Sequence, residues 1–445
     1  MDPLLYVQEE FNNVKRALDE SLRFDYGPGG QTGDYYEECH LRLILIQDEL
    51  DRLRSGAMIG HTATIVGQLW DLAKRLALIE RSHLGEFSWP FAEAIREIAM
   101  SLLSEDEGLD GKVKPIIHMI AEGTTYQISH ETVMGPSQKR RLYTVAFPRQ
   151  LKHHVLMHAL FGHELGHATF YSNPQDLFAG APPSKKIIEI LQREGPFEHL
   201  AATLDWLMKE DAPPAIKARI EKAPDKLTKS YVDHWLVELV CDLFGLALFG
   251  PAFAAAHRTY LEPACRTPYE IETDKLSHPA YALRRQTLIG AMRSLGWLTP
   301  VTGITNRKVR AAEQAFIDYI GTDDISPWAA TFSDEQLGEV FAVIRGHFDA
   351  TATAMAKRPD ADMLAALVDR LSQHLPPIRE DIDKEGVSTT YAVRLEEQLY
   401  AGWTYWMGRE QLDKTPLDFF ELNQLCDLAL LQQRAIDLSH GWRRL

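Results

Sequence analysis

Residues 151–171 read LKHHVLMHALFGHELGHATFY and contain an H-E-x-x-H pattern, His163-Glu164-Leu165-Gly166-His167. On a helix, side chains four residues apart lie on the same face. His163 and His167 would therefore point two imidazoles at one metal ion, with Glu164 beside them. Two histidine ligands and a carboxylate from one helical turn form a set that binds zinc. Because three fixed positions also match by chance, the rest of the chain has to supply the remaining parts of such a site.

The composition of the chain is that of an ordinary globular protein. Of its 445 residues, 45% are hydrophobic and 25% are charged. The formal net charge of −16 argues against general nucleic-acid binding. The four cysteines form no C-x-x-C pair, which suits a reducing compartment. Because no signal-like leader and no apolar run of membrane-spanning length occurs, we expect a soluble, cytoplasmic protein without a membrane span.

The order of predicted elements divides the chain into three regions. Residues 1–110 carry apolar positions at helical spacing and predict a helical N-terminal region. Three short runs rich in β-branched and aromatic residues predict the strands of a small sheet that leads into the motif helix: 114–120, 125–129 and 141–147. Further helices are predicted after the motif at about 185–193, 196–211, 214–223, 230–249 and 279–295. We expect an α+β, predominantly helical fold, with the core at 111–300 and a helical C-terminal region at 301–445.

A catalytic zinc site takes three protein ligands and keeps one position open, so a third ligand is needed. In residues 237–250, VELVCDLFGLALFG, the only charges are Glu238 and Asp242. Buried carboxylates are costly unless they are paired or bind a metal. We expect Glu238 to bind the ion and Asp242 to accept a hydrogen bond from a ligating histidine. His234, one turn earlier, is the main rival to Glu238, and a solvated stripe on an amphipathic helix is the alternative for both carboxylates.

The segment 276–285, LSHPAYALRR, supplies a further set of polar side chains. His278-Pro279 is expected to open a helix, with the proline in its first turn. A histidine or arginine here could enter a cleft and stabilise the oxyanion that forms when water attacks a carbonyl. The alternative is a helix start with ordinary surface residues. Three other histidines are expected to lie upstream on the motif helix and to pack or solvate there: His153, His154 and His158.

The three motifs together resemble the gluzincin metallopeptidases. They are H-E-x-x-H at 163–167, E-x-x-x-D at 238–242, and H-P with an arginine six residues after the histidine at 278–284. The resemblance is closest to the clan of the CAAX prenyl proteases and the heat-shock membrane metalloproteases, and it covers about residues 140–290. It implies a zincin-like core with these roles: His163, His167 and Glu238 as Zn²⁺ ligands, Glu164 as general base, Asp242 as the partner of a ligand, and His278 and Arg284 as supporting cleft residues.

The resemblance implies hydrolysis of a peptide bond in a protein or peptide substrate. The chain departs from the family in three respects, because it has no spanning segment, carries Cys241 where the family prefers alanine, and has N- and C-terminal helical regions without a counterpart in the family pattern. The alternative function is a catalytically inactive zinc-binding scaffold or interaction protein. The helical regions at 1–110 and 301–445 could gate the cleft or bind a regulatory protein partner.

Overall fold

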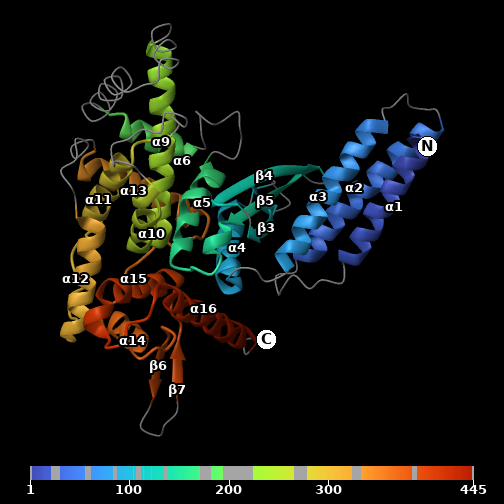
Figure 1. Cartoon of the computed structure of the whole chain (residues 1–445). Helices are drawn as coiled ribbons and strands as arrows, with labels where there is room; N and C mark the ends of the chain where they lie inside the picture. Colours follow the sequence, from blue (N-terminus) through green and yellow to red (C-terminus); the bar gives the residue numbers. More distant parts are fainter. Residues whose placement is uncertain are drawn as a thin grey trace. The chain divides into compact units, whose positions relative to one another are not determined.

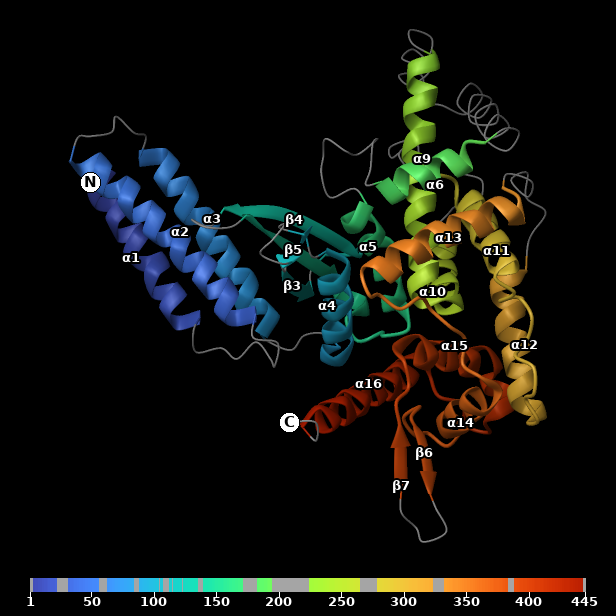
Figure 2. The same ribbon diagram turned by 180° about the vertical axis from the view of Figure 1, so that it is seen from behind.

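A computed structural model gives the structure of the protein (Figures 1 and 2). It describes residues 3–21, 31–55, 62–83, 88–103, 105–106, 112–113, 115–121, 123–134, 139–170, 182–193, 224–264, 278–322, 332–382 and 388–442. The described chain is mostly helical with a small three-stranded sheet, which confirms the predominantly helical α+β class. It forms two compact units, residues 1–92 with 103–152, and residues 93–102 with 153–445.

A three-helix bundle forms much of the first unit. Its helices are α1 (Pro3–Ser21), α2 (Gln31–Arg54) and α3 (Thr62–His83). Apolar residues at helical spacing meet in its core, among them Val7, Leu18, Leu50, Leu69 and Leu76. The described residues of the N-terminal bundle are therefore helical, as the periodicity predicts.

The small sheet of the first unit has the order β3-β5-β4. Its strands are β3 (Ile116–Ala121), β4 (Gln127–Met134) and β5 (Lys139–Phe147), and β5 pairs parallel with β3 and antiparallel with β4. Tyr143, Val145 and Phe147 alternate along β5 and are buried, as expected for a strand with one covered face. Helices α2 and α3 contact β3. The three predicted strands are confirmed, with ends that differ by a few residues.

The second unit gathers around the long helix α9 (Pro224–Phe249). Helices α5 (Phe161–Phe170), α6 (Pro182–Leu191), α10 (Pro251–Leu261), α11 (Tyr281–Ser294) and α13 (Asp334–Ala350) contact it, as both views of the ribbon show. Residues 235–250 are buried throughout, as expected for a helix that is hydrophobic all round. Gly250 ends α9 with a φ of 60°, and Pro251 opens α10 directly after it.

Helix α4 (Trp89–Leu103) lies between the bundle and the sheet in the sequence. The remaining described helices belong to the C-terminal part, and they are α12 (Arg307–Gly321), α14 (Ala361–Ser372), α15 (Leu395–Leu412) and α16 (Phe419–Trp442). Short elements complete the list: η2 (Arg149–Leu151), η3 (Met157–Leu160), η5 (Glu262–Ala264), and the paired strands β1 (Glu105–Asp106) with β2 (Lys112–Val113) and β6 (Arg379–Ile382) with β7 (Ser388–Tyr391). The hairpin β6–β7 was not predicted.

The motif helix α5 packs unusually close to α9 because glycine faces it. A Cβ added to Gly162 would lie 2.6 Å from the Cα of Gly245. A Cβ added to Gly166 would lie 3.0 Å from the Cα of Cys241. The glycines of the motif stretch therefore let the two backbones approach, which brings the polar faces of α5 and α9 together.

The prediction that His153, His154 and His158 lie on the motif helix is wrong, because α5 begins only at Phe161. The backbone of Leu156 makes hydrogen bonds to side chains of other elements instead of the i to i+4 hydrogen bonds of a helix. Its N–H donates to the side chain of Asn423, and its carbonyl accepts from the indole of Trp403. These distant partners fix an irregular segment that ends in the 3₁₀ turn η3.

Two other helix predictions need correction, and two lie outside the described residues. Helix α11 begins at Tyr281 with Ala280 as its N-cap, so Pro279 precedes the helix and does not lie in its first turn. Helix α9 begins at Pro224 instead of about residue 230. The helices predicted at 196–211 and 214–223 fall outside the described ranges. None of the described helices has the length and hydropathy that a membrane crossing requires.

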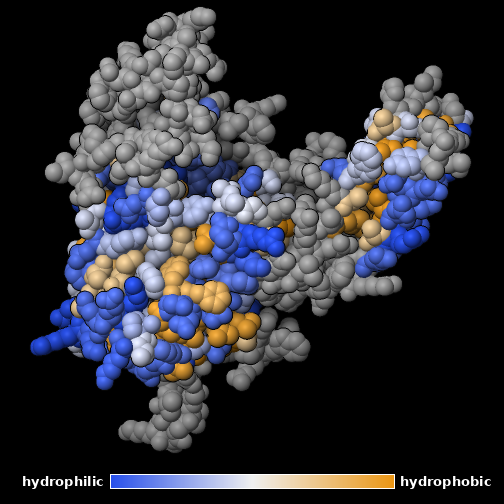
Figure 3. Space-filling model, viewed as in Figure 1, coloured by the Kyte–Doolittle hydropathy of each residue, from blue (hydrophilic) through white to orange (hydrophobic). Residues whose placement is uncertain are grey.

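The visible face of the second unit mixes hydrophilic and hydrophobic residues (Figure 3). A few charged side chains are buried inside the fold. In the described ranges the buried ones are Glu93, Glu238, Asp242, Arg284, Glu313 and Glu397. Three of them, Glu238, Asp242 and Arg284, come together in one cluster.

Candidate metal centre

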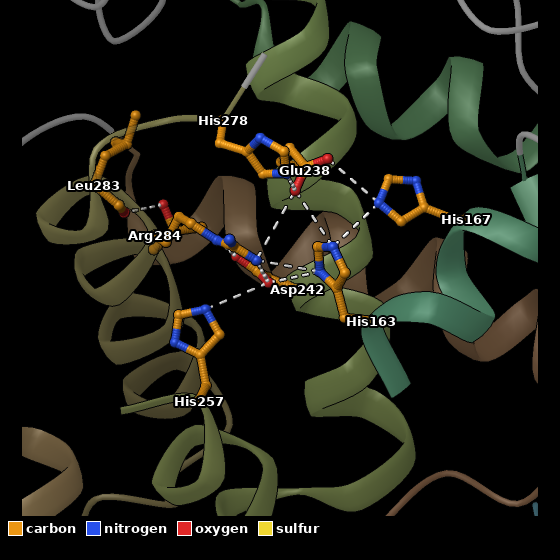
Figure 4. Close-up of polar contacts among 9 residues, drawn as sticks. His163, His167, Glu238, Asp242, His257, His278, Leu283 and Arg284 are labelled. Atoms are coloured by element: carbon orange, nitrogen blue, oxygen red, sulfur yellow. Dashed lines mark hydrogen bonds and ion pairs between the residues drawn. The ribbon is translucent and has the colours of Figure 1, made fainter. Parts of the chain in front are cut away.

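The cluster combines side chains from four helices and one connecting segment of the second unit (Figure 4). Helix α5 carries two of its histidines and α9 carries its two carboxylates. Helices α10 and α11 add a further histidine and the arginine, and a histidine just before α11 lies at the edge. The members are His163, His167, Glu238, Asp242, His257, His278 and Arg284.

Three potential ligand atoms form a small triangle. The Nε2 atoms of His163 and His167 are 3.1 Å apart, and each is 3.3 Å from an oxygen of Glu238. Bonds of 2.0–2.1 Å around a tetrahedral zinc ion would set neighbouring ligands roughly 3.3–3.4 Å apart. Within the described part of the chain, these residues are the one group of three or more whose ligand atoms lie close enough to share an ion. The predicted ligands thus come together in the fold.

The state of Glu238 fits a bound cation. Its side chain is 9% exposed, and its Oε2 atom makes no hydrogen bond to a protein group. Such a carboxylate oxygen is costly inside a protein, and a cation between Glu238 and the two histidines would satisfy it. His234 does not belong to the ligand group, so Glu238 is the better candidate for the third ligand. The alternative of a solvated stripe is wrong, because Glu238 and Asp242 are both buried.

Asp242 contacts His163, the first histidine of the motif, at the ring nitrogen that faces away from the three candidate ligand atoms. Its Oδ1 lies 2.8 Å from Nδ1 of His163 and 2.6 Å from Nη2 of Arg284, and its Oδ2 accepts from Nε of Arg284 at 2.7 Å. With Nδ1 facing a carboxylate, the other ring nitrogen of His163 is free to face the ligand triangle. The predicted contact between Asp242 and a candidate ligand is present. Arg284 was expected in the cleft, but its guanidinium is buried and forms an ion pair with Asp242.

The electrostatics of the cluster favour a cation. Burial alone would raise the pKa of the Glu238 carboxyl, but the imidazoles of His163 and His167 beside it outweigh burial and hold the pKa well below its usual range. Burial also acts to raise the pKa of Asp242, and the Arg284 guanidinium beside it holds that pKa low. Burial lowers the pKa of His163, yet the two carboxylates together raise it to about 10. The two carboxylates therefore favour a positive charge at the position of the three candidate ligands.

Glu164 lies on α5 next to the ligands and is only partly buried. Burial and the charge of Glu164 raise the pKa of Tyr260 on α10, so this phenol lies within electrostatic reach of the carboxylate. Burial and nearby carboxylates also raise the pKa of the Cys241 thiol well above its usual value. Cys241 is therefore an inert packing residue.

The exposed side of the site lies toward His167 and His278. The side chain of His167 is 31% exposed and that of His278 is 47% exposed. The Nε2 atom of His278 is 3.7 Å from Oε2 of Glu238, so this imidazole lies at the rim of the ligand triangle. A substrate would reach the ligands from this side.

His257 is a member of the cluster that the sequence did not reveal. It lies on α10, is 2% exposed, and places its Nε2 3.6 Å from Oδ1 of Asp242. The surrounding sequence, PAFAAAHRTYL, has no spacing that relates it to the three motifs. Only the packing of α10 on α9 brings this histidine to the site.

Comparisons of the chain with protein-family models, curated proteins and solved structures found no match. The resemblance to the gluzincins therefore rests on the three sequence motifs and stays a prediction. The structure brings residues of all three motifs together in one cluster.

Proposed function

We propose that this chain is a zinc-dependent metalloendopeptidase with a zincin-like core. The main support is the ligand triangle of His163, His167 and Glu238, with separations of 3.1–3.3 Å and a buried carboxylate oxygen that has no hydrogen bond. The position of Glu164 beside this triangle favours a catalytic site over a structural one, because a structural zinc site needs no additional carboxylate.

His163, His167 and Glu238 would hold the ion and leave its exposed side open. Bound there, zinc would lower the pKa of a water molecule toward neutrality and polarise the carbonyl of the peptide bond. Asp242 keeps His163 in the tautomer that presents Nε2 to the ion, and Arg284 holds Asp242 in place.

Glu164 would act as the general base and then as the general acid. It takes a proton from the attacking water and delivers a proton to the leaving amine. His278, at the exposed rim, is the residue we assign to the developing oxyanion, since a hydrogen-bond donor is needed where that negative charge forms. Arg284 does not contact the substrate in this assignment, because its guanidinium is bound to Asp242.

The substrate class is a protein or peptide, and zinc is the cofactor. The described cysteines are free and buried, namely Cys39, Cys241 and Cys426, which suits a protein of a reducing compartment such as the cytoplasm. The net charge of −16 gives no support to nucleic acid as a partner. The helical N- and C-terminal regions are the places where a regulatory protein would bind.

The test compares the wild-type chain with Glu164→Gln on a mixture of unstructured peptides analysed by mass spectrometry. We expect the wild type to cleave in a chelator-sensitive manner, and Glu164→Gln to retain zinc but to lose at least ~100-fold in rate. Glu189→Gln, which changes an exposed glutamate on α6, is the control and should cleave normally.

An unchanged rate in Glu164→Gln would refute the assigned base. If the wild type holds zinc but cleaves nothing, the inactive zinc-binding scaffold becomes the better description. Proteins captured from cell extract by Glu164→Gln would then be compared with those captured by the wild type, because a true substrate should accumulate only on the variant.

A further inference from the structure

His257 is held in one orientation by aromatic packing. Its ring stacks on Tyr281 with an interplanar angle of 17° and a centroid distance of 6.0 Å. The ring of Phe253, one turn earlier on α10, lies 5.7 Å away and tilted by 42°. The imidazole is 2% exposed, so neither solvent nor rotation competes with this placement.

The edge of this ring points at the carboxylate that supports the metal ligand (Figure 4). Nε2 of His257 is 3.6 Å from Oδ1 of Asp242 and has no hydrogen-bond partner. A carboxylate offers about four acceptor positions, and the donors of His163 and Arg284 occupy three on Asp242. The Nε2 of His257 faces Oδ1, the oxygen that already accepts from His163 and Arg284, so it is a third and longer contact at that oxygen.

His257 meets Asp242 as a neutral group. Burial lowers the pKa of His257 to about 3, and the cation of Arg284 opposes the effect of Asp242. A neutral imidazole with its proton on Nε2 presents an N–H dipole to the carboxylate without adding a second cation beside Arg284. A contact of 3.6 Å is longer than a hydrogen bond, so the N–H dipole acts on the Asp242 carboxylate through its electrostatic attraction.

We propose that His257 is a positioning residue of the metal centre, whose N–H keeps Asp242 oriented toward His163 and thereby strengthens metal binding. This inference rests on the metal site of the proposed function and does not depend on peptidase activity. It gives α10 a role in the site, in addition to the helices that carry the three motifs.

The test measures the affinity of the full chain for Zn²⁺ by competition with a chromophoric chelator. His257→Phe keeps an aromatic ring between Tyr281 and Phe253 but removes the N–H. His257→Gln keeps a nitrogen donor near the position of Nε2 but loses the aromatic packing. Groups that orient a ligand from outside the coordination sphere change metal affinity by 10–100-fold, and we expect the lower end, about 10-fold, for His257→Phe. His257→Gln should bind zinc within about 3-fold of the wild type.

The control removes a partly buried imidazole elsewhere in the second unit. His347 on α13 packs on Phe170 and Phe348, and its Nε2 also lacks a hydrogen bond, but no carboxylate of the cluster faces it. His347→Phe should therefore leave zinc affinity unchanged. Thermal unfolding of each zinc-free variant shows whether it is folded before its affinity is compared.

The order of affinities decides the matter. If His257→Phe binds zinc as tightly as the wild type while His257→Gln binds more weakly, His257 serves packing only and the proposal fails. If both variants match the wild type, the proposal also fails, and the metal site stands. If the wild type itself binds no zinc, the proposed function fails instead, so the two failures are distinguishable.

Discussion

The buried ion pair between Arg284 and Asp242 leads to a prediction about stability. Asp242 is fully buried and Arg284 is 8% exposed, and two hydrogen bonds of 2.6 and 2.7 Å join them. Arg284→Met would keep much of the side-chain volume but leave the carboxylate facing only His163 and His257. Breaking a buried pair by removing one partner costs about 3–5 kcal/mol. At roughly 2–4 °C for each kcal/mol, the Tm should fall by about 6–20 °C.

The assay is thermal and urea unfolding of the metal-free protein. Arg293→Met is the control on the same helix, since Arg293 pairs with Asp334 at 3.5 Å with both side chains about half exposed. Such a surface pair contributes no more than about 1 kcal/mol. The double variant Arg284→Met with Asp242→Asn removes both charges and should recover part of the loss, because the two residues act as one unit.

Equal stability of Arg284→Met and Arg293→Met would refute the reasoning. It would mean that Asp242 finds another partner or takes up a proton without cost. A double variant that is less stable than the sum of the single changes would also contradict the pairing.

Three further predictions concern the third zinc ligand, the proton bound by His163, and the close contact of α5 with α9 at Gly162. Glu238→Ala should lose zinc on metal analysis while His234→Ala keeps it, and full retention in Glu238→Ala would move the third-ligand role to His234. Because the pKa of His163 is raised to about 10, zinc binding at pH 7 should release about one proton, measured by calorimetry in buffers of different ionisation enthalpy. The same raised pKa stabilises the metal-free fold below about pH 6.5, and this contribution should fade as pH rises through 10; no proton release and no such trend would contradict the assignment. Gly162→Ala should cost about 1–3 kcal/mol in urea unfolding, whereas Gly346→Ala, with open space at its Cβ, should not destabilise.

The sequence could indicate the candidate ligands because the spacing of residues along a helix places them in pairs. Residues four apart share a helix face, which places His163 beside His167 and Glu238 beside Asp242. The carboxylates could be recognised because they are the only charges in an apolar run, and the structure buries both. Each pair can be recognised without knowing how distant segments pack, whereas the meeting of the two pairs depends on the packing of α5 on α9.

Features that depend on distant partners could not be predicted. The motif helix starts late because Leu156 bonds to Asn423 and Trp403, which lie far along the chain. The direction of Arg284 is set by Asp242 on another helix, and spacing alone cannot reveal it. His257 was missed because it lies on α10, and only the packing of α10 on α9 brings it to Asp242.

X-ray absorption at the zinc edge of the purified, zinc-loaded full chain reports the ligands of the ion directly. We expect one zinc per chain, with two imidazole nitrogens at about 2.0–2.1 Å from His163 and His167 and the remaining ligands oxygen at about 2.0–2.2 Å. A sulfur ligand at about 2.3 Å, a set of three or four imidazoles, or the failure of the chain to bind zinc would contradict a centre built from His163, His167 and Glu238.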